Sequence, residues 1–349
     1  MTQLQEATER HRFDADRLAA YLAGRMPGFA GALAVKQFQG GQSNPTYLLA
    51  TPTRRYVMRT KPGPVARLLP SAHAIEREFR VMGALAAQGV PVPEVLLLCE
   101  DESVIGRAFF LMEHVDGRIF WEQSLPGLAP AERGAIYDEM NRVIAALHRV
   151  DVERAGLADY GKAGNYFARQ IGRWSRQYRA SETEPIEAMD RLIDWLSAHV
   201  PAGDETTVVH GDFRLDNLIF HQTQARVLAV IDWELSTLGH PLADFSYLCM
   251  GWHIPPGAFR GIAGLDLAAL GIPAEDDFVR RYCERTGRGG IEHWNFYLAY
   301  NLFRIAAILQ GVYKRALEGL ASADNALSAG ANARALAAIG WRYAAKADA

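Results

Sequence analysis

Two short segments in the second half of the chain carry side chains that could do chemistry on a hydroxyl group. The first runs His-Gly-Asp-Phe-Arg-Leu-Asp-Asn, in which His210 and Asp212 are followed by Asn217. The second is an apolar run, typical of a strand, that ends at Asp232. A carboxylate can accept or orient the proton of a hydroxyl, and amide and carboxylate oxygens are ligands that Mg²⁺ prefers. The pattern predicts a catalytic Asp212 beside a magnesium site made by Asn217 and Asp232.

The order and spacing of these residues resemble a known family. The spacing H-x-D-x-x-x-x-N, followed by a strand that ends in Asp, is the arrangement of protein kinases. The run His-Gly-Asp-Phe-Arg-Leu-Asp-Asn-Leu-Ile begins at His210, and the run Ile-Asp-Trp-Glu-Leu-Ser-Thr-Leu-Gly-His-Pro-Leu-Ala-Asp ends at Asp244. Both resemble the aminoglycoside phosphotransferase and choline kinase superfamily, and most of all the kinase domains found alongside acyl-CoA dehydrogenases. The resemblance extends from about Phe38 to Tyr313.

This resemblance implies ATP and Mg²⁺ as cofactors and assigns supporting roles. His210 would brace the catalytic loop, and Asp244 would hold that loop from the helix that follows the metal strand. Asp216 and Glu234 could contact a second metal or water, although solvated carboxylates explain them almost as well. The alternative for the whole pattern is two unrelated turns, since Asp and Asn are common turn residues.

A glycine-containing turn near the N-terminus is the candidate phosphate loop. Gly40, Gly41, Ser43 and Asn44 lie between two predicted strands. Glycine lets the backbone approach a phosphate, and hydroxyl and amide groups can donate hydrogen bonds to it. The turn lacks the G-x-G-x-x-G and P-loop patterns, so it is assigned to phosphate binding chiefly by its position in the family.

Further nucleotide contacts are expected from the strand and helix that follow. Arg59 and Lys61 are two residues apart on a predicted strand and so face the same side. By resemblance Arg59 is the phosphate-binding cation, with Lys61 as the alternative, and Glu78 is the ion-pair partner. The backbone groups of Glu113 and Val115 would contact adenine.

The apolar periodicity predicts the elements that position these residues. It indicates an α+β chain whose strands lie mainly in the N-terminal part and whose helices lie mainly in the C-terminal part. The family resemblance implies that these parts form a protein-kinase-like bilobal fold, with a small N-terminal lobe made of an antiparallel sheet and a helix and a larger, mostly helical C-terminal lobe. We expect the nucleotide-binding lobe over residues 1–115 and the catalytic and acceptor-binding lobe over residues 116–349. The expected strands lie within 34–59, 95–99, 108–114, 207–210, 218–220 and 227–231, and the expected helices within 14–26, 72–88, 131–149, 166–199 and after residue 242.

The identity of the phosphate acceptor is less defined. Tyr297, Asn301 and Arg304 form a polar stripe at helical spacing that could line an acceptor groove, and buried packing explains it equally well. Basic residues slightly outnumber acidic ones after Gly251, which does not suit a polycationic aminoglycoside. Together with the resemblance, this favours a small-molecule hydroxyl acceptor such as a hydroxylated acyl chain, free or as a CoA thioester, and a functional link to acyl-CoA dehydrogenases.

Composition sets further limits. The 349 residues are 49% hydrophobic and 22% charged, which is typical of a globular protein that can bury a core. The net charge of −3 does not indicate a basic surface that would bind nucleic acid or an anionic membrane. The three cysteines show no paired spacing, and the N-terminus lacks a signal-peptide core, so a cytoplasmic location is expected.

Two other functions remain as alternatives. A nucleotide-binding pseudokinase that acts as an interaction module is disfavoured by the full set of Asp212, Asn217 and Asp232. A protein kinase is disfavoured because the D-F-G and A-P-E motifs are absent from the sequence.

Overall fold

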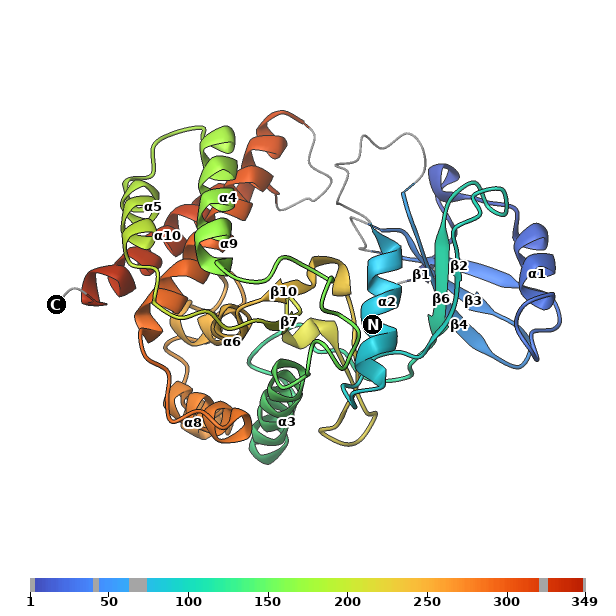
Figure 1. The fold of residues 1–349 in the computed structure, drawn as a ribbon, viewed down its shortest axis with the longest axis horizontal. Helices are drawn as coiled ribbons and strands as arrows, with labels where there is room; N and C mark the ends of the chain where they lie inside the picture. The colour runs from blue at the N-terminus through green and yellow to red at the C-terminus, as the bar shows by residue number, and fades with distance from the viewer. Residues whose placement is uncertain (1–3, 40–43, 63–73, 320–325, 348–349) are drawn as a thin grey trace. The chain divides into compact units, whose positions relative to one another are not determined.

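The computed structural model describes residues 4–39, 44–62, 74–319 and 326–347 (Figure 1). The chain forms two compact units, which are described separately. The first unit comprises Met1–Ile119, Val152–Tyr160 and Asp216–Ser236, and the second comprises Phe120–Asp151, Gly161–Leu215 and Thr237–Ala349. Each unit is therefore built from segments that are distant in sequence. The two continuous lobes that we expected, over residues 1–115 and 116–349, remain a prediction.

The first unit is built on an antiparallel sheet with the strand order β1-β2-β3-β4-β6-β5. Helices α1 and α2 lie on opposite sides of this sheet (Figure 1). A separate hairpin of β8 and β9 is flanked by the single turns η2 and η3. The bounds are β1 Leu4–Gln5, η1 Glu9–His11, α1 Ala15–Ala23, β2 Ala34–Phe38, β3 Thr46–Ala50, β4 Arg55–Thr60, α2 Ile75–Ala86, β5 Val95–Cys99, β6 Phe109–Glu113, η2 Leu215–Asn217, β8 Leu218–Phe220, β9 Val227–Val230 and η3 Trp233–Leu235.

Strand alternation divides the sheet of the first unit into two faces. Tyr47 and Leu49 of β3 and Met58 of β4 point to the face that Leu18 and Leu22 of α1 cover, and all five are fully buried. Burying each of the aliphatic side chains contributes about 1.5–3 kcal/mol. The opposite face carries Arg59 of β4 opposite Phe110 of β6 in the strand register, and Phe110 packs edge-to-face on Phe79 of α2. This second face is the one that presents a charge to α2.

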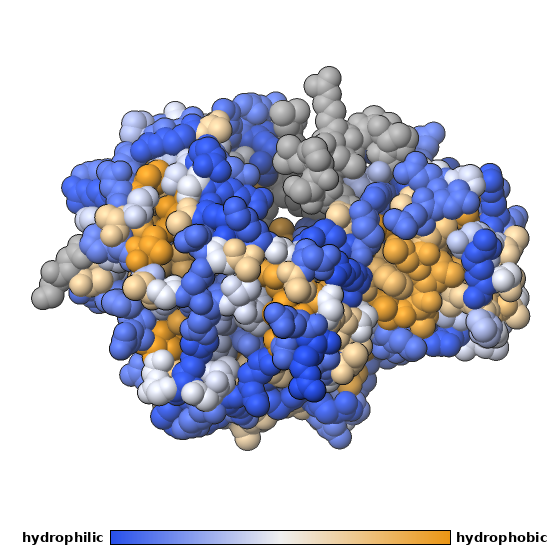
Figure 2. Space-filling model, in the orientation of Figure 1, coloured by the Kyte–Doolittle hydropathy of each residue, from blue (hydrophilic) through white to orange (hydrophobic). Residues whose placement is uncertain are grey.

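The outer strand β5 leaves part of the first unit apolar at its surface. Val95, Leu96, Leu97 and Leu98 are all half-buried. Figure 2 shows an apolar area over the part of this unit where Figure 1 labels β6, the neighbour of β5 in the sheet.

The second unit is mostly helical. Helices α4, α5, α9 and α10 pack side by side, α6 packs on α9, and α3 packs on α8 (Figure 1). β7 and β10 form a short antiparallel pair, and β7 leads into the loop of His210, Gly211 and Asp212, the candidate catalytic loop. The bounds are α3 Pro130–His148, α4 Tyr166–Ser181, α5 Glu187–Ala198, β7 Thr207–Val209, β10 Thr237–Gly239, α6 Pro241–Cys249, η4 Met250–His253, α7 Leu267–Leu270, α8 Glu275–Thr286, α9 Trp294–Leu317, η5 Ala326–Ser328 and α10 Ala329–Ala347.

Most of the expected elements appear close to their expected bounds. The periodic stretch 166–199 is divided into α4 and α5, because Pro185 disfavours helical backbone at the residue before it. The strands β1 and β10 were not expected, since two or three residues are too few to show an alternating pattern. In the described part of the chain no helix is both long and apolar enough to cross a membrane.

Candidate active site

The loop that carries Asp212 follows strand β7 directly and is shaped by its neighbours in sequence. His210 is fully buried, and its Nδ1 accepts a hydrogen bond from the backbone N–H of Asp212 at 3.2 Å. Gly211 adopts a φ of +82°, a left-handed conformation that costs glycine little and other residues more. This tight turn fixes the direction in which the Asp212 side chain leaves the loop.

Asp244 holds the same loop from helix α6. Its carboxylate accepts the backbone N–H of His210 at 2.6 Å and that of Gly211 at 2.9 Å, and His148 Nε2 lies at 3.5 Å. Burial alone would raise the pKa of Asp244, but the hydrogen bond and charge of His148, the charge of His210 and the backbone donor at His210 together lower it. Asp244 is therefore a buried anion whose partners belong to the catalytic loop and to α3.

The Asp212 carboxylate is held at both of its oxygens. The Tyr247 hydroxyl donates to Oδ1 at 2.6 Å, and Arg214 Nε lies 2.9 Å from Oδ2. Burial, together with the negative charge of Asp212, raises the pKa of Tyr247, so its hydroxyl stays protonated and remains a donor. A hydrogen bond and an ion pair thus orient the Asp212 carboxylate.

The polar stripe on α9 serves packing in this structure. Asn301 is fully buried, and its Nδ2 donates to the carbonyl of Ala243 at 2.9 Å and to Ser246 Oγ at 2.7 Å. Tyr297 is also buried and stacks on the ring of His240. These contacts join α9 to α6, so we assign Tyr297 and Asn301 to packing, which is the other explanation that the sequence left open.

Arg304, the third residue of that stripe, lies behind the catalytic loop. Its Nη2 donates to the carbonyl of Gly211 at 2.6 Å, and its guanidinium lies over the rings of Tyr247 and Trp174. Arg304 therefore supports both the loop backbone and the tyrosine that orients Asp212, and it does so from a buried position.

The expected metal ligands lie in the first unit, where Asn217 directly precedes β8 and Asp232 follows β9. Leu218 pairs with Val230, and the N–H of Ile231 donates to the carbonyl of Asn217 at 2.9 Å, so Asn217 lies beside the strand end that leads to Asp232. Asp232 has φ 68° and ψ 58°, a left-handed conformation that is uncommon in non-glycine residues but that aspartate adopts more readily than most. The two residues offer an amide oxygen and a carboxylate, a donor set that fits Mg²⁺.

Arg59 is surrounded by three carboxylates of the first unit. Its Nε lies 3.0 Å from Glu78 Oε2, and its Nη2 lies 3.3 Å from Asp232 Oδ1 and 3.2 Å from Glu234 Oε2. Burial would lower the pKa of Arg59, but the charges of Glu78, Asp232 and Glu234 raise it, so the guanidinium stays charged. From the sequence, Glu234 could have been either a metal contact or a solvated surface residue. In the structure it pairs with Arg59.

Glu78 is the most buried of these three acids, with a side chain 3% exposed. Its second oxygen accepts Asn44 Nδ2 at 3.0 Å. Burial raises the pKa of Glu78 from 4.5 to about 7, because it outweighs the opposing charge of Arg59 and because Asp232 and Glu234 add negative charge nearby.

The other nucleotide candidates are placed as follows. Lys61 pairs with Glu76 at 3.1 Å, and both side chains are about one-third exposed. Glu113 ends β6, where its backbone N–H donates to the carbonyl of Glu94, and Val115 follows in the segment after that strand. Gly40, Gly41 and Ser43 lie outside the described residues.

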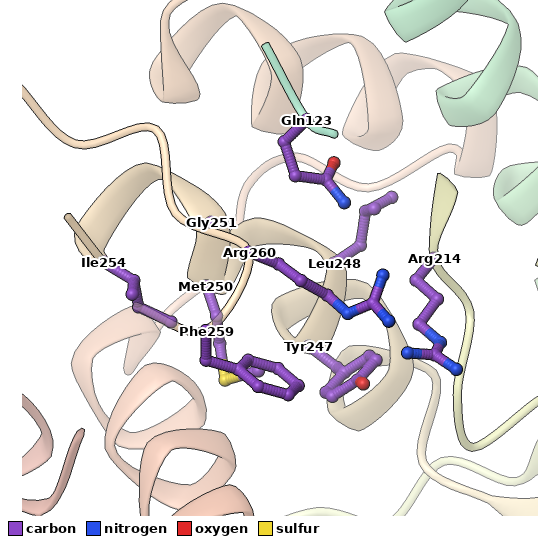
Figure 3. Close-up of a pocket in the computed structure, with 9 residues that line it drawn as sticks. All are labelled: Gln123, Arg214, Tyr247, Leu248, Met250, Gly251, Ile254, Phe259 and Arg260. Carbon is purple, nitrogen blue, oxygen red and sulfur yellow. The ribbon is translucent and has the colours of Figure 1, made fainter. Parts of the chain in front are cut away.

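A pocket of the second unit is lined in part by Arg214 and Tyr247, the two residues that contact the Asp212 carboxylate (Figure 3). Its walls come from helix α6, the turn η4 and the loop that follows, together with Gln123 and Arg214. Figure 3 shows the guanidinium groups of Arg214 and Arg260 extending toward the side chain of Tyr247. The lining residues are Gln123, Arg214, Tyr247, Leu248, Met250, Gly251, Ile254, Phe259 and Arg260.

The sequence analysis did not select most of the residues around Asp212. Tyr247 follows Asp244 by three positions, so the helical period places both on one face of α6, and this spacing was the available signal. Arg214 is two residues from Asp212 within the same motif. His148 and Arg260 are distant in sequence from the motif, and no local pattern indicated either of them.

Comparisons with known proteins identify the family of this chain. A family model described as the phosphotransferase enzyme family matches residues 34–290. Acyl-CoA dehydrogenase family member 10 of Mus musculus is 51% identical over 334 residues, and family member 11 of Homo sapiens is 42% identical over 328 residues. These alignments cover 95% and 92% of this chain but only 31% and 42% of the relatives, so the chain spans less than half of their length.

Solved structures show the same fold. A protein of Ralstonia eutropha, assigned to the aminoglycoside phosphotransferases by name only, is 61% identical, with a TM-score of 0.89 over 96% of this chain and 99% of that one. Aminoglycoside phosphotransferase APH(4)-Ia, in a complex with AMP-PNP and hygromycin B, is 17% identical, with a TM-score of 0.61 over 93% of this chain and 98% of that one. The second similarity shows the fold alone. The chain therefore belongs to the phosphotransferase enzyme family and has its α+β, protein-kinase-like fold.

Proposed function

We propose that this chain is an ATP- and Mg²⁺-dependent small-molecule kinase that moves the γ-phosphoryl group of ATP to a hydroxyl of a hydroxylated acyl chain, free or as a CoA thioester. The observation that carries the proposal is the Asp212 carboxylate, which a hydrogen bond from Tyr247 and an ion pair with Arg214 orient, while both of these residues line a pocket of the second unit. Membership of the phosphotransferase family supports the type of reaction.

The residues of the chain have distinct tasks in this reaction. Asp212 accepts the proton of the acceptor hydroxyl as its oxygen bonds to phosphorus and the bond between phosphorus and the ADP oxygen breaks. Arg59 binds phosphate oxygens, and Glu78 keeps its guanidinium in position. Asn217 and Asp232 would hold Mg²⁺, which neutralises phosphate charge when bound. His210 and Asp244 keep the catalytic loop in shape.

Adenine recognition is assigned to backbone groups of Glu113 and Val115, and the segment of Gly40, Gly41, Ser43 and Asn44 is assigned to the phosphates. Asn44 supports this assignment indirectly, because its side chain contacts Glu78, the partner of Arg59. Lys61 remains the alternative cation, although its partner Glu76 lies on the more exposed part of α2.

A cytoplasmic location and a link to acyl-CoA dehydrogenases are part of the proposal. Cys99, Cys249 and Cys283 are all described, buried and free of disulfides, which suits a reducing compartment. The relatives are named as acyl-CoA dehydrogenase family members and are longer than this chain. We propose that this kinase acts on a hydroxylated acyl compound in the same metabolic context.

The test is ADP release by the wild type and by Asp212→Ala with MgATP and a panel of hydroxyacyl-CoAs, free hydroxy acids, choline, sugars and aminoglycosides. We expect one acceptor class to stimulate turnover, and we expect the variant to lose on the order of 10²-fold or more of that rate. Chelation of Mg²⁺ by EDTA should abolish it as well.

The matched control is Asp276→Asn, an exposed residue in the first turn of α8, which should leave turnover unchanged. ATP binding without any turnover that depends on Asp212 would contradict the kinase proposal and favour the pseudokinase.

A further inference from the structure

The pocket beside Asp212 has a distinctive chemical lining. Its nine lining residues, all in the described part of the second unit, include two arginines and no carboxylate. The other walls are largely apolar, formed by Leu248, Met250 and Ile254 together with the ring of Phe259. A ligand that fits this lining combines a hydrocarbon segment with a negatively charged group.

Arg214 connects the pocket to the catalytic carboxylate. Its Nε lies 2.9 Å from Asp212 Oδ2, and the same side chain lines the pocket. Tyr247 has the same double position, since its hydroxyl donates to Asp212 and its ring is part of the pocket wall. A molecule in this pocket is therefore in reach of the group that would accept a hydroxyl proton.

Arg260 is placed by a tightly built loop. Its φ is 52°, a left-handed conformation that carries a cost for arginine. The loop folds back on itself, because Ile262 N donates to the carbonyl of Gly251 at 2.8 Å and Ala263 N donates to that of Ile254 at 2.9 Å. A Cβ at Gly261 would lie 1.9 Å from the oxygen of Ile254, so only glycine fits this close turn.

We propose that Arg214 and Arg260 form an anion subsite that holds a negatively charged group of the acceptor, with the neighbouring hydrocarbon against the apolar wall and the hydroxyl at Asp212. This inference rests on the proposed phosphotransferase function and defines its acceptor specificity. Guanidinium groups recognise carboxylates and phosphates, and a lining without a carboxylate offers the ammonium groups of a polycation no counter-charge. The subsite thus selects anionic acceptors and rejects aminoglycosides.

The anionic group could be a carboxylate of the free hydroxy acid or a phosphate of its CoA thioester, and the choice of probe distinguishes them. We would compare a short-chain hydroxycarboxylate, its CoA thioester, its uncharged methyl ester and kanamycin. Binding would be measured by calorimetry in the presence of AMP-PNP, and KM and kcat by ADP release with MgATP. Arg260→Glu and Arg260→Met would be compared with Arg342→Glu, which reverses the charge of an exposed arginine on α10.

For the anionic acceptor we expect Arg260→Glu to raise both Kd and KM on the order of 100-fold, with kcat and AMP-PNP affinity little changed. Arg260→Met should have a smaller effect, and Arg342→Glu none. The methyl ester should bind weakly and equally to all four proteins. A loss confined to the CoA thioester would identify the phosphates as the bound group, whereas a loss with the free acid would identify the carboxylate.

Three results would overturn the subsite proposal. Arg260→Glu could affect charged and uncharged acceptors equally, the wild type could turn over kanamycin, or neither anion could bind detectably. These results test the anion subsite and not the kinase proposal, which is tested by ADP release. Binding of the anion that depends on Arg260 would support the subsite even if no ADP were released.

Discussion

Replacement of Glu78 by glutamine should stabilise the protein at alkaline pH while it impairs the site. Glu78 is almost fully buried, and its pKa is raised from 4.5 to about 7. Between these values the unfolded chain is ionised at this position while the folded protein keeps the proton. The stability that Glu78 contributes is therefore fully present below pH 4.5 and falls as pH rises toward about 7.

The size of this effect follows from the shift. A displacement from 4.5 to about 7 corresponds to about 3 kcal/mol of lost stability once pH exceeds the folded value. Glutamine has a similar shape and cannot ionise, so Glu78→Gln avoids this loss. The free energy of unfolding of the variant, relative to wild type, should rise by about 2 kcal/mol between about pH 5.5 and about pH 8.5.

Urea unfolding of both proteins across this pH range is the measurement. Glu76→Gln is the matched control, because Glu76 lies on the same helix with a side chain 38% exposed and pairs with Lys61. We expect its effect to stay below about 1 kcal/mol at every pH. A difference between Glu78→Gln and wild type that does not change with pH, or that becomes destabilising as pH rises, would refute the reasoning. It would show that attraction to Arg59 outweighs burial.

Two other predictions concern helix α6. Asp244→Asn should lower the free energy of unfolding by about 3 kcal/mol, because its amide nitrogen would face the N–H donor of either His210 or Gly211 in a buried site and because the buried charge is lost. Urea unfolding of this variant beside Asp276→Asn tests the prediction. His240 begins α6, and burial lowers its pKa from 6.5 to about 4, so the wild type should lose up to about 3 kcal/mol of stability as pH falls through this range. His240→Asn, which keeps a capping side chain, should remove that acid-dependent loss, and equal pH profiles of the two proteins would contradict the burial of a neutral imidazole.

The sequence could indicate a candidate site because the residues proposed for it are close together in short motifs. His210, Asp212 and Asn217 belong to one short sequence motif, and Asp232 follows the next strand pair, so the spacing of the motif was enough to select them as candidates. Strand alternation also placed Arg59 and Lys61 on one side of β4. It could not show which of them would be buried, because that depends on how α2 packs on the sheet.

Helical spacing was less informative about what a face contacts. Tyr297, Asn301 and Arg304 do share one side of α9, but the period of a helix does not show whether that side meets solvent, a ligand or another helix. Here it meets α6 and the catalytic loop. Arg260 could not be found in this way, since its position depends on a loop that folds back through contacts with Gly251 and Ile254.

The link between Asp244 and the catalytic loop also bears on how this region opens and closes. If α6 moved away, its buried carboxylate would lose its donors, and the amides of His210 and Gly211 would lose their acceptor. Separating such a buried charge from its partners costs several kcal/mol, so partial opening is disfavoured. We expect α6 and the loop to unfold and refold as one cooperative segment, which would keep the geometry around Asp212 intact whenever the helix is in place.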